Sequence, residues 1–184
     1  FWFNTYKIFG SANDTVRHAS FQVMSIVSTT GFSTVDFNNW PALSKAVLLL
    51  LMFIGGCAGS TAGGIKISRL VIMLKARFRE FGKMLHPRSV RAVKMESKTL
   101  DEQTLNGVTS YFSIYAVCFF VIFFALSFES FDFETNFTAT LTCISNVGPG
   151  LSKVGPAGNF SEYSDFSKVV LSFAMLLGRL EIFP

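Results

Sequence analysis

Charged residues are scarce in this sequence of 184 amino acids: Asp, Glu, Lys and Arg together make up 15%, whereas 50% of the residues are hydrophobic, 22 Phe among them. Soluble globular domains carry about a quarter charged residues, so this composition argues against an ordinary soluble domain. Cysteine is also rare. Cys57, Cys118 and Cys143 lack the spacing of a zinc site or a disulfide framework, and we expect free thiols that fill space between helices.

The charges that are present are unevenly placed. Ten of the 16 Lys and Arg fall between Lys66 and Lys98, where the only acidic residues are Glu80 and Glu96. A basic stretch can bind nucleic acid, but this one lies between two strongly apolar segments, and short basic loops mark the cytoplasmic side of membrane proteins. We therefore predict a cytoplasmic loop and no nucleic-acid partner.

Neither end of the sequence resembles a natural terminus. It opens on Phe-Trp-Phe with no Met and no signal peptide, and it stops inside an apolar helix at Glu181-Ile-Phe-Pro. We expect both ends to be internal to a longer protein.

A short apolar segment leads twice into a polar stretch that contains glycine. Phe21 to Val27 precedes Ser-Thr-Thr-Gly-Phe-Ser-Thr-Val-Asp at 28–36, and the segment from Phe137 to Ile144 precedes Ser-Asn-Val-Gly-Pro-Gly. Each apolar segment is too short to cross a membrane, which needs roughly 20 residues. We predict two re-entrant pore loops, with Gly31 and Gly148 in an ion selectivity filter.

The first pore helix is expected over Asp14–Val27, with Asn13 or Asp14 as its cap. His18 within it is interpreted as an interfacial residue, because no other metal ligand lies at helical spacing beyond Asp14. A turn at 38–41 with a Trp at the membrane boundary follows, and Pro41 suits the first turn of an apolar helix over 42–54.

Five glycines fall within Gly55 to Gly64, at a depth where the preceding helix should still lie in hydrocarbon. Each glycine costs about 1 kcal/mol in a helix interior relative to alanine, so the run favours an unwound segment, which at this depth must face protein or a water-filled cavity. The alternative is a small-residue packing face of the Gly-xxx-Gly kind. We favour the unwound loop, because the glycines spread over all faces of a helix.

Six further elements are expected after the glycine run. In order, these are a helix over Ile65–Phe81, a cytoplasmic connection over 82–103 containing His86 and Pro87, a transmembrane helix over Asn106–Phe128, a pore helix over Glu134–Ile144, an outer loop over 151–165 and an apolar helix from Phe166.

An internal repeat supports this organisation. The segments 43–55 and 166–178 match at Ser, Lys, Val, Leu, Met and Gly with an offset of 123, while Gly31 and Gly148 are 117 residues apart. The unit of pore helix, filter and inner helix therefore occurs twice, with six extra residues in the second outer loop. Two parallel copies predict rotational symmetry about a central pore, which more repeats or subunits must complete.

This arrangement suits cation transport. A ring of backbone carbonyls can replace the hydration shell of a cation without side-chain charge, and glycine lets successive carbonyls turn towards one axis. We expect Ser28, Thr30 and Asn146 to hydrogen-bond the loops from behind. We expect an all-α membrane protein built from repeated units of outer helix, re-entrant pore loop and inner helix around a channel-like pore.

With these motifs the chain resembles the C-terminal half of a Trk/Ktr/HKT-type potassium transporter membrane subunit, closest to the bacterial Trk and Ktr branch. The resemblance is carried by Ser-Thr-Thr-Gly-Phe-Ser-Thr from Ser28, Gly-Gly-Cys-Ala-Gly-Ser-Thr-Ala-Gly-Gly-Ile-Lys from Gly55, Ser-Asn-Val-Gly-Pro-Gly from Ser145 and Gly-Arg-Leu-Glu from Gly178. It implies four repeats in one polypeptide. The domains would then be 1–81 (repeat three without its outer helix), 82–103 (the basic connection) and 104–184 (repeat four with a truncated inner helix).

The resemblance also implies site residues. The filter would comprise Thr29, Thr30, Gly31, Phe32, Asn146, Val147, Gly148 and Pro149. K⁺, as the transported ion with no covalently bound cofactor, would be held by the carbonyls of Thr30, Gly31, Asn146, Val147 and Gly148. The gate below the filter would comprise Gly55, Gly56, Ala58, Gly59, Ser60, Thr61, Ala62, Gly63, Gly64 and Arg179. Independently of the resemblance, we expect Arg179 and Glu181 to form a functional pair, because charges within a membrane segment are costly and usually face a cavity. The alternative is that Arg179 snorkels to the inner surface.

The partners implied by the family are membrane lipid, a second copy in a homodimer, and cytosolic nucleotide-binding subunits of the Rossmann type that the basic 66–98 face could meet. The protein would be a multi-pass component of the bacterial cytoplasmic (inner) membrane and not an enzyme, acting as a channel or as a symporter.

Three other functions are considered beside ion transport. An intramembrane serine hydrolase with Ser60 as nucleophile would need a base, yet His18 and His86 are expected on opposite sides of the membrane. A phosphate loop is disfavoured because the glycine run lacks the Gly-Lys-Ser/Thr ending. The other competing function is that of a membrane scaffold that has lost transport, against which the two filter glycines argue.

Overall fold

The computed structural model describes residues 5, 8–57, 59–60, 62–85, 93–95 and 98–180. Helices dominate these residues, and the strands are two residues long each. In chain order the elements are α2 (Ala12–Val27), η1 (Phe37–Asn39), α3 (Ala42–Phe53), β1 (Ile54–Gly55), β2 (Ile65–Lys66), α4 (Ile67–Leu85), β3 (Lys94–Met95), β4 (Lys98–Thr99), α5 (Glu102–Leu126), α6 (Phe133–Ile144), η2 (Ser152–Val154) and α7 (Asp165–Arg179).

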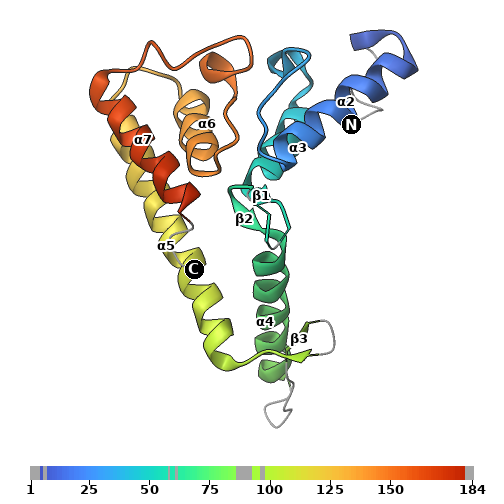
Figure 1. The fold of residues 1–184 in the computed structure, drawn as a ribbon, viewed down its shortest axis with the longest axis vertical. Coiled ribbons are helices and arrows are strands. Elements are labelled where there is room, and N and C mark those ends of the chain that lie inside the picture. Colours follow the sequence, from blue (N-terminus) through green and yellow to red (C-terminus); the bar gives the residue numbers. More distant parts are fainter. Residues whose placement is uncertain are drawn as a thin grey trace.

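The helices form two groups that diverge like the arms of a V in the view of Figure 1. One group contains α2, α3 and α4, and the other contains α5, α6 and α7. The segment around the antiparallel pair β3–β4 joins α4 to α5 at the lower end of the view, whereas α3 contacts α6 at the upper end. The helices before and after the β3–β4 segment thus form separate groups that contact each other through α4 and α5 and through α3 and α6.

α5 is the one helix, among the described residues, that is long and apolar enough to cross a membrane. It begins four residues before the predicted Asn106 and ends two residues before Phe128. The face that carries Val117, Val121 and Phe124 is exposed, while Tyr115 and Phe119 are buried against the rest of the protein. This asymmetry is typical of a helix with one face towards lipid.

The inner helix of the first group is broken, as the glycine run predicts. α3 ends at Phe53, and the chain leaves helical geometry until α4 begins. β1 and β2 pair in parallel, with Ile54 opposite Ile65, and so close the base of the intervening loop. The helix resumes two residues later than predicted, because Ile65 and Lys66 belong to this strand pair. The Gly-xxx-Gly packing face is thereby excluded.

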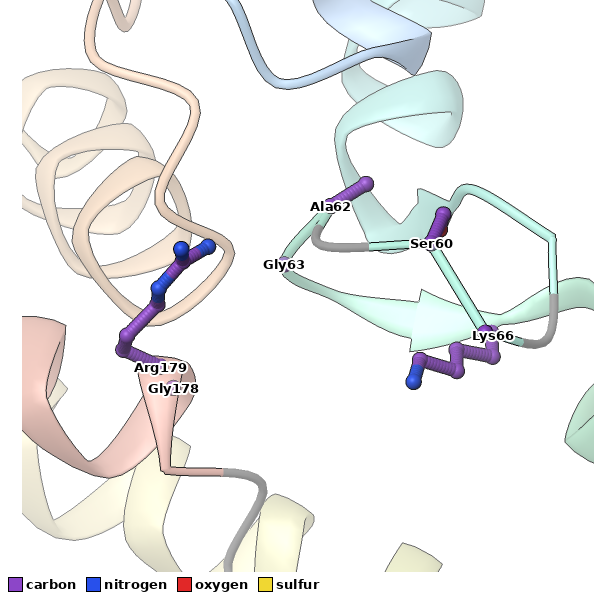
Figure 2. Close-up of a pocket in the computed structure, with 7 residues that line it drawn as sticks. Ser60, Ala62, Gly63, Lys66, Gly178 and Arg179 are labelled. Atoms are coloured by element: carbon purple, nitrogen blue, oxygen red, sulfur yellow. The ribbon is translucent and has the colours of Figure 1, made fainter.

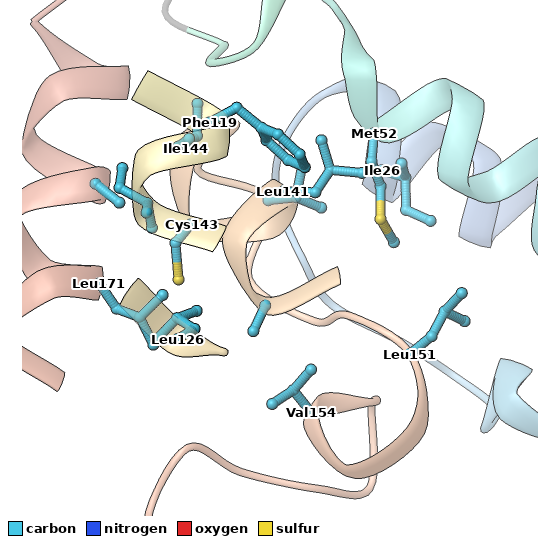
Figure 3. Close-up of a cluster of buried hydrophobic side chains, with 14 of the residues drawn as sticks. Ile26, Met52, Phe119, Leu126, Leu141, Cys143, Ile144, Leu151, Val154 and Leu171 are labelled. Atoms are coloured by element: carbon cyan, nitrogen blue, oxygen red, sulfur yellow. The ribbon is translucent and has the colours of Figure 1, made fainter. Parts of the chain in front are cut away.

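The hydrophobic core surrounds α6, as Figure 3 shows. Leu141 and Ile144 of α6 are buried together with Met52 of α3, Phe119 of α5 and Leu171 of α7. The threonines of α6 are also buried, and their hydroxyl groups are satisfied: Thr140 Oγ1, for example, donates to the carbonyl of Asn136 at 2.9 Å. A helix too short to span the bilayer is thus held inside protein on nearly all sides.

Both pore helices start close to their predicted positions. α6 begins at Phe133, one residue early, and Asp132 caps it by accepting hydrogen bonds from the backbone and hydroxyl of Thr135. The predicted caps of α2, Asn13 and Asp14, are wrong: the N-cap residue is Ser11, whose carbonyl accepts hydrogen bonds from the N–H and the hydroxyl of Thr15.

The internal repeat holds in three dimensions. α2 and α6 end 117 residues apart, at Val27 and Ile144, and α3 and α7 begin 123 residues apart, at Ala42 and Asp165. One matched pair of serines is also equally buried, since Ser44 and Ser167 of the inner helices each expose 1% of their surface. The six extra residues therefore lie in the outer loop between α6 and α7, as predicted.

At the lower end of Figure 1, α4 extends to Leu85, four residues beyond the predicted Phe81. Arg79 of α4 contacts Glu102 at the start of α5, with 2.8 Å between Nη1 and Oε1. The pKa of Arg79 is raised, chiefly by this hydrogen bond, so the guanidinium stays charged. His86 and Pro87 of the predicted connection lie outside the described residues.

Candidate selectivity filter and gate

Both pore helices end in the same turn. Thr29 and Asn146, 117 residues apart, occupy the left-handed region with φ of 54° and 53°. The N–H of the next residue returns to the last helical turn in each case: Thr30 donates to the carbonyl of Ser25 at 2.9 Å, and Val147 donates to that of Thr142 at 3.0 Å. The two loops therefore have one backbone design despite different sequences.

The glycines that follow also have positive φ, 78° at Gly31 and 111° at Gly148. Each loop therefore has two residues with positive φ within three positions, a conformation that glycine adopts at low steric cost. The backbone conformation thus favours glycine at both positions.

A side-chain hydroxyl six residues before each glycine supports its loop. Ser25 Oγ donates to the carbonyl of Phe32, and Thr142 Oγ1 donates to that of Pro149 at 3.2 Å. Thr142 Oγ1 additionally accepts a hydrogen bond of 2.9 Å from the N–H of Gly148. The sequence analysis missed Ser25 and Thr142, although the 117-residue repeat aligns them and both carry a hydroxyl.

The expected supporting residues behave differently from one another. Ser28 Oγ and Thr30 Oγ1 are 2.7 Å apart and bridge the first loop, in line with the prediction. Asn146 instead donates from Nδ2 to the carbonyl of Met175 in α7, at 3.2 Å. Its amide therefore ties the second loop to an inner helix, and its predicted role behind the loop is wrong in this respect.

The two loops meet each other. A β-carbon on Gly31 would collide with the carbonyl oxygen of Val147, and one on Gly148 would lie 3.9 Å from the Gly31 α-carbon. A cavity of about 210 Å³ opens beside this contact, and its lining residues are Thr29, Thr30, Thr142, Cys143, Asn146, Val147, Gly148 and Met175. Five of the eight predicted filter residues thus surround one space, Gly31 abuts it, and Phe32 is 72% exposed.

The glycine-rich loop between β1 and β2 contacts the ends of both pore helices. The N–H of Gly63 donates to Thr29 Oγ1 at 3.4 Å, and a β-carbon on Gly63 would collide with the carbonyl oxygen of Ser145. Gly178 of α7 also packs closely against the end of α6, because a β-carbon on Gly178 would collide with the carbonyl oxygen of Ile144. The loop therefore lies directly against the filter segments.

A second cavity, of about 390 Å³, separates the loop from the end of α7. Figure 2 shows Arg179 across this space from Ala62 and Gly63. Its lining residues are Gly59, Ser60, Ala62, Gly63, Lys66, Gly178 and Arg179. Lys66, the first residue of the basic stretch, thus shares a cavity with Arg179. The predicted gate residues Ala58 and Thr61, and Glu181, lie outside the described residues.

Two carboxylates accept hydrogen bonds at the starts of α7 and α6. Glu129 Oε1 accepts hydrogen bonds from the hydroxyl groups of Ser164 and Ser167, and this holds the pKa of Glu129 below its usual value. The hydrogen bonds from Thr135 likewise lower the pKa of Asp132. Both groups remain negatively charged at neutral pH, where they fix the starts of α7 and α6.

The geometry gives no support to a serine hydrolase. Ser60 Oγ donates to the carbonyl of Cys57 at 2.7 Å, while the ring of His18 stacks on Phe9 and hydrogen-bonds Thr34. No cluster of metal-binding side chains occurs among the residues that the structure describes. The three cysteines are free, but Cys57 is exposed, so its expected role as a filler between helices is wrong.

Comparison with known proteins gives consistent matches. A family model described as "TrkH: Cation transport protein" matches residues 4–184. The Trk system potassium uptake protein TrkH of Escherichia coli strain K12 is 38% identical over 182 residues, and TrkG of the same strain is 36% identical over 169. The crystal structure of the potassium transporter TrkH from Vibrio parahaemolyticus matches with a TM-score of 0.90 at 38% identity.

These matches are unequal in coverage. The match to E. coli TrkH includes 99% of this chain but 37% of the relative, and the match to TrkG includes 91% and 34%. For the V. parahaemolyticus structure the shares are 99% and 39%. The chain therefore spans little more than a third of the length of the proteins that it resembles.

Proposed function

Since the chain belongs to the TrkH family of cation transport proteins, we propose that it forms part of the ion pathway of a potassium uptake protein in the bacterial cytoplasmic membrane. The observation that carries the proposal is the equivalence of the two filter loops. Thr29 and Asn146 share one backbone conformation, and Gly31 and Gly148 each follow two residues later with positive φ. Two such loops in contact are half of a fourfold ring of carbonyls.

In this proposal K⁺ is the transported ion and not a resident cofactor. It passes between the loops, held by the carbonyls of Thr30, Gly31, Asn146, Val147 and Gly148, with the remaining oxygens supplied by the rest of the full-length protein. Hydroxyl groups behind the loops favour this role, because Ser25 and Thr142 hold the backbone in place without competing for the ion.

The glycine-rich loop acts as the gate below the filter. Its contact with Thr29 and Ser145 supports this role, because an ion that leaves the filter on this side would meet the loop. Arg179 and Lys66 beside the same cavity would oppose the passage of a cation while the loop is in this position.

The remaining features suit a membrane protein with partners. The exposed apolar face of α5 would contact lipid. We assign residues 1–81 and 104–184 to two successive repeats and 82–103 to their cytoplasmic connection. The basic residues of α4 offer a surface for nucleotide-binding subunits of the Rossmann type, and the parent protein would act as a homodimer.

The proposal is tested by uptake of radioactive rubidium into liposomes that contain the full-length parent protein, compared with the Gly31→Asp variant. We expect uptake that potassium blocks far better than sodium does, and loss of uptake in the variant. A wild-type protein that is well folded and transports no cation, even after the loop at 55–64 is shortened, would instead be a scaffold that has lost transport.

A further inference from the structure

Gly63 lies at the point where the gate loop meets both repeats. On one side its N–H donates to Thr29 Oγ1, and on the other its α-carbon fits against the carbonyl of Ser145 and the side chain of Asn146. Ser145 is fully buried, and its hydroxyl is 3.3 Å from that of Tyr115 in α5. The loop is therefore pressed against a rigid surface and bonded to Thr29.

Thr29 also belongs to the filter. The residue is one of those that line the 210 Å³ cavity beside the two loops, and its left-handed backbone begins the turn that leads to Gly31. Thr29 thus contacts the gate loop through its hydroxyl oxygen and also borders the space beside the filter. The same oxygen is suited to bind a cation, because a hydroxyl offers two lone pairs.

The equivalent position in the other repeat makes a comparable bond to a different kind of partner. Asn146 donates to the carbonyl of Met175, which belongs to the continuous helix α7. Thr29 bonds Gly63, which belongs to the interrupted segment between α3 and α4. Each filter loop is therefore tied to the inner segment of its own repeat, and in repeat three that segment is a loop and not a helix.

From this geometry we propose that the hydroxyl of Thr29 is shared between the gate and the ion. In the closed arrangement it accepts the N–H of Gly63, and a cation at the inner end of the filter takes the same oxygen. A cation and an N–H group on one oxygen repel each other strongly where water is excluded, so an ion in this position weakens the closed gate. The inference rests on the proposed function, because it requires ions in the filter.

The length of the bond suits this role. At 3.4 Å the N···O distance is longer than the 2.7–3.2 Å of ordinary protein hydrogen bonds, so the bond is weak and its loss costs little. The absence of a side chain at residue 63 is what lets the loop approach this closely. Thr29 is accordingly a positioning residue for the gate as well as a filter residue.

Hydrogen exchange of the loop tests the proposal without relying on transport. The full-length protein is placed in lipid nanodiscs, and exchange of peptides covering 56–66 is followed in potassium and in choline buffer. We expect the wild type to exchange about two- to tenfold faster in potassium, the range that one hydrogen bond contributes. Thr29→Val should exchange fast in both buffers, and Thr29→Ser, which keeps the hydroxyl, should behave as the wild type.

Thr140→Val is the matched control, because the Thr140 hydroxyl bonds within α6 and its loss should leave loop exchange unchanged. Peptides from α5 report whether each variant is folded. Equal loop exchange in Thr29→Val and wild type in choline buffer, or no effect of potassium on a wild type that transports rubidium, would overturn the shared hydroxyl while leaving the proposed function intact. Absence of wild-type uptake would instead refute the proposed function.

Discussion

The α-carbon of Gly31 lies against the carbonyl oxygen of Val147, with no room for a β-carbon between them. The two residues belong to different repeats and are 116 positions apart, so each filter loop limits the shape of the other. A side chain at Gly31 is excluded twice over, by the positive φ of 78° and by this contact.

We therefore expect Gly31→Ala to abolish potassium-selective rubidium uptake by the full-length protein in liposomes. The matched control is Gly10→Ala, because Gly10 has a φ of 66° but open space around its α-carbon. The control carries the cost of positive φ alone and should keep its uptake. Equal loss of uptake in both variants would show that backbone strain, and not the contact with Val147, is responsible.

Thr142→Val should weaken the second filter loop. The variant is nearly isosteric, but it leaves the N–H of Gly148 without its 2.9 Å partner, at a cost of about 1–3 kcal/mol. We expect reduced discrimination between potassium and sodium in competition assays, and recovery in Thr142→Ser. Thr140→Val on the same helix should discriminate as the wild type, and a Thr142→Val variant with unchanged discrimination would refute this role.

Asn38 joins the outer loops of the two repeats. Its Nδ2 donates to the carbonyl of Ser152 at 3.0 Å, and its Oδ1 accepts the N–H of Ser152 at 2.9 Å. Asn38→Ala removes both bonds, and we expect a destabilisation of about 1–3 kcal/mol, seen as a lower melting temperature of the full-length protein. The neighbouring Asn39 is exposed, so Asn39→Ala should melt within experimental error of the wild type.

The cap of α6 should make stability depend on acidic pH. Because hydrogen bonds from Thr135 hold the pKa of Asp132 below its unfolded value of about 3.9, the stabilisation is complete above that value and is lost as pH falls through the folded-state pKa. Asp132→Asn keeps a good cap but no titration. Melting temperatures measured from pH 7 to 3 should converge for wild type and variant at the acid end, and parallel curves would contradict the prediction.

Much of the fold follows from local features of the sequence. The ends of both pore helices, at Val27 and Ile144, are predicted correctly because apolar residues stop there and a polar, glycine-containing loop begins. The unwound segment after Phe53 is likewise predicted, since glycine disfavours helix wherever it occurs. The repeat adds the equivalence of the two units, because matched segments fold alike.

Other features depend on contacts between distant residues, which composition and spacing do not specify. The bond between Gly63 and Thr29 joins a loop to the turn that follows α2, 34 positions earlier, and the strand pair that delays α4 forms only when Ile54 meets Ile65. The supporting hydroxyl groups of Ser25 and Thr142 could have been found, since the repeat aligns them, but serine and threonine are common in short helices and neither stands out alone.

The break between α3 and α4 also sets a condition on biosynthesis. α3 has 12 residues, fewer than the roughly 20 that cross the hydrocarbon core. The translocon inserts a segment according to its own hydrophobicity, and among the described helices α5 alone meets that standard by length and composition. We therefore expect the insertion of α3 to depend on contacts with other helices, among them α6, which is synthesised after it.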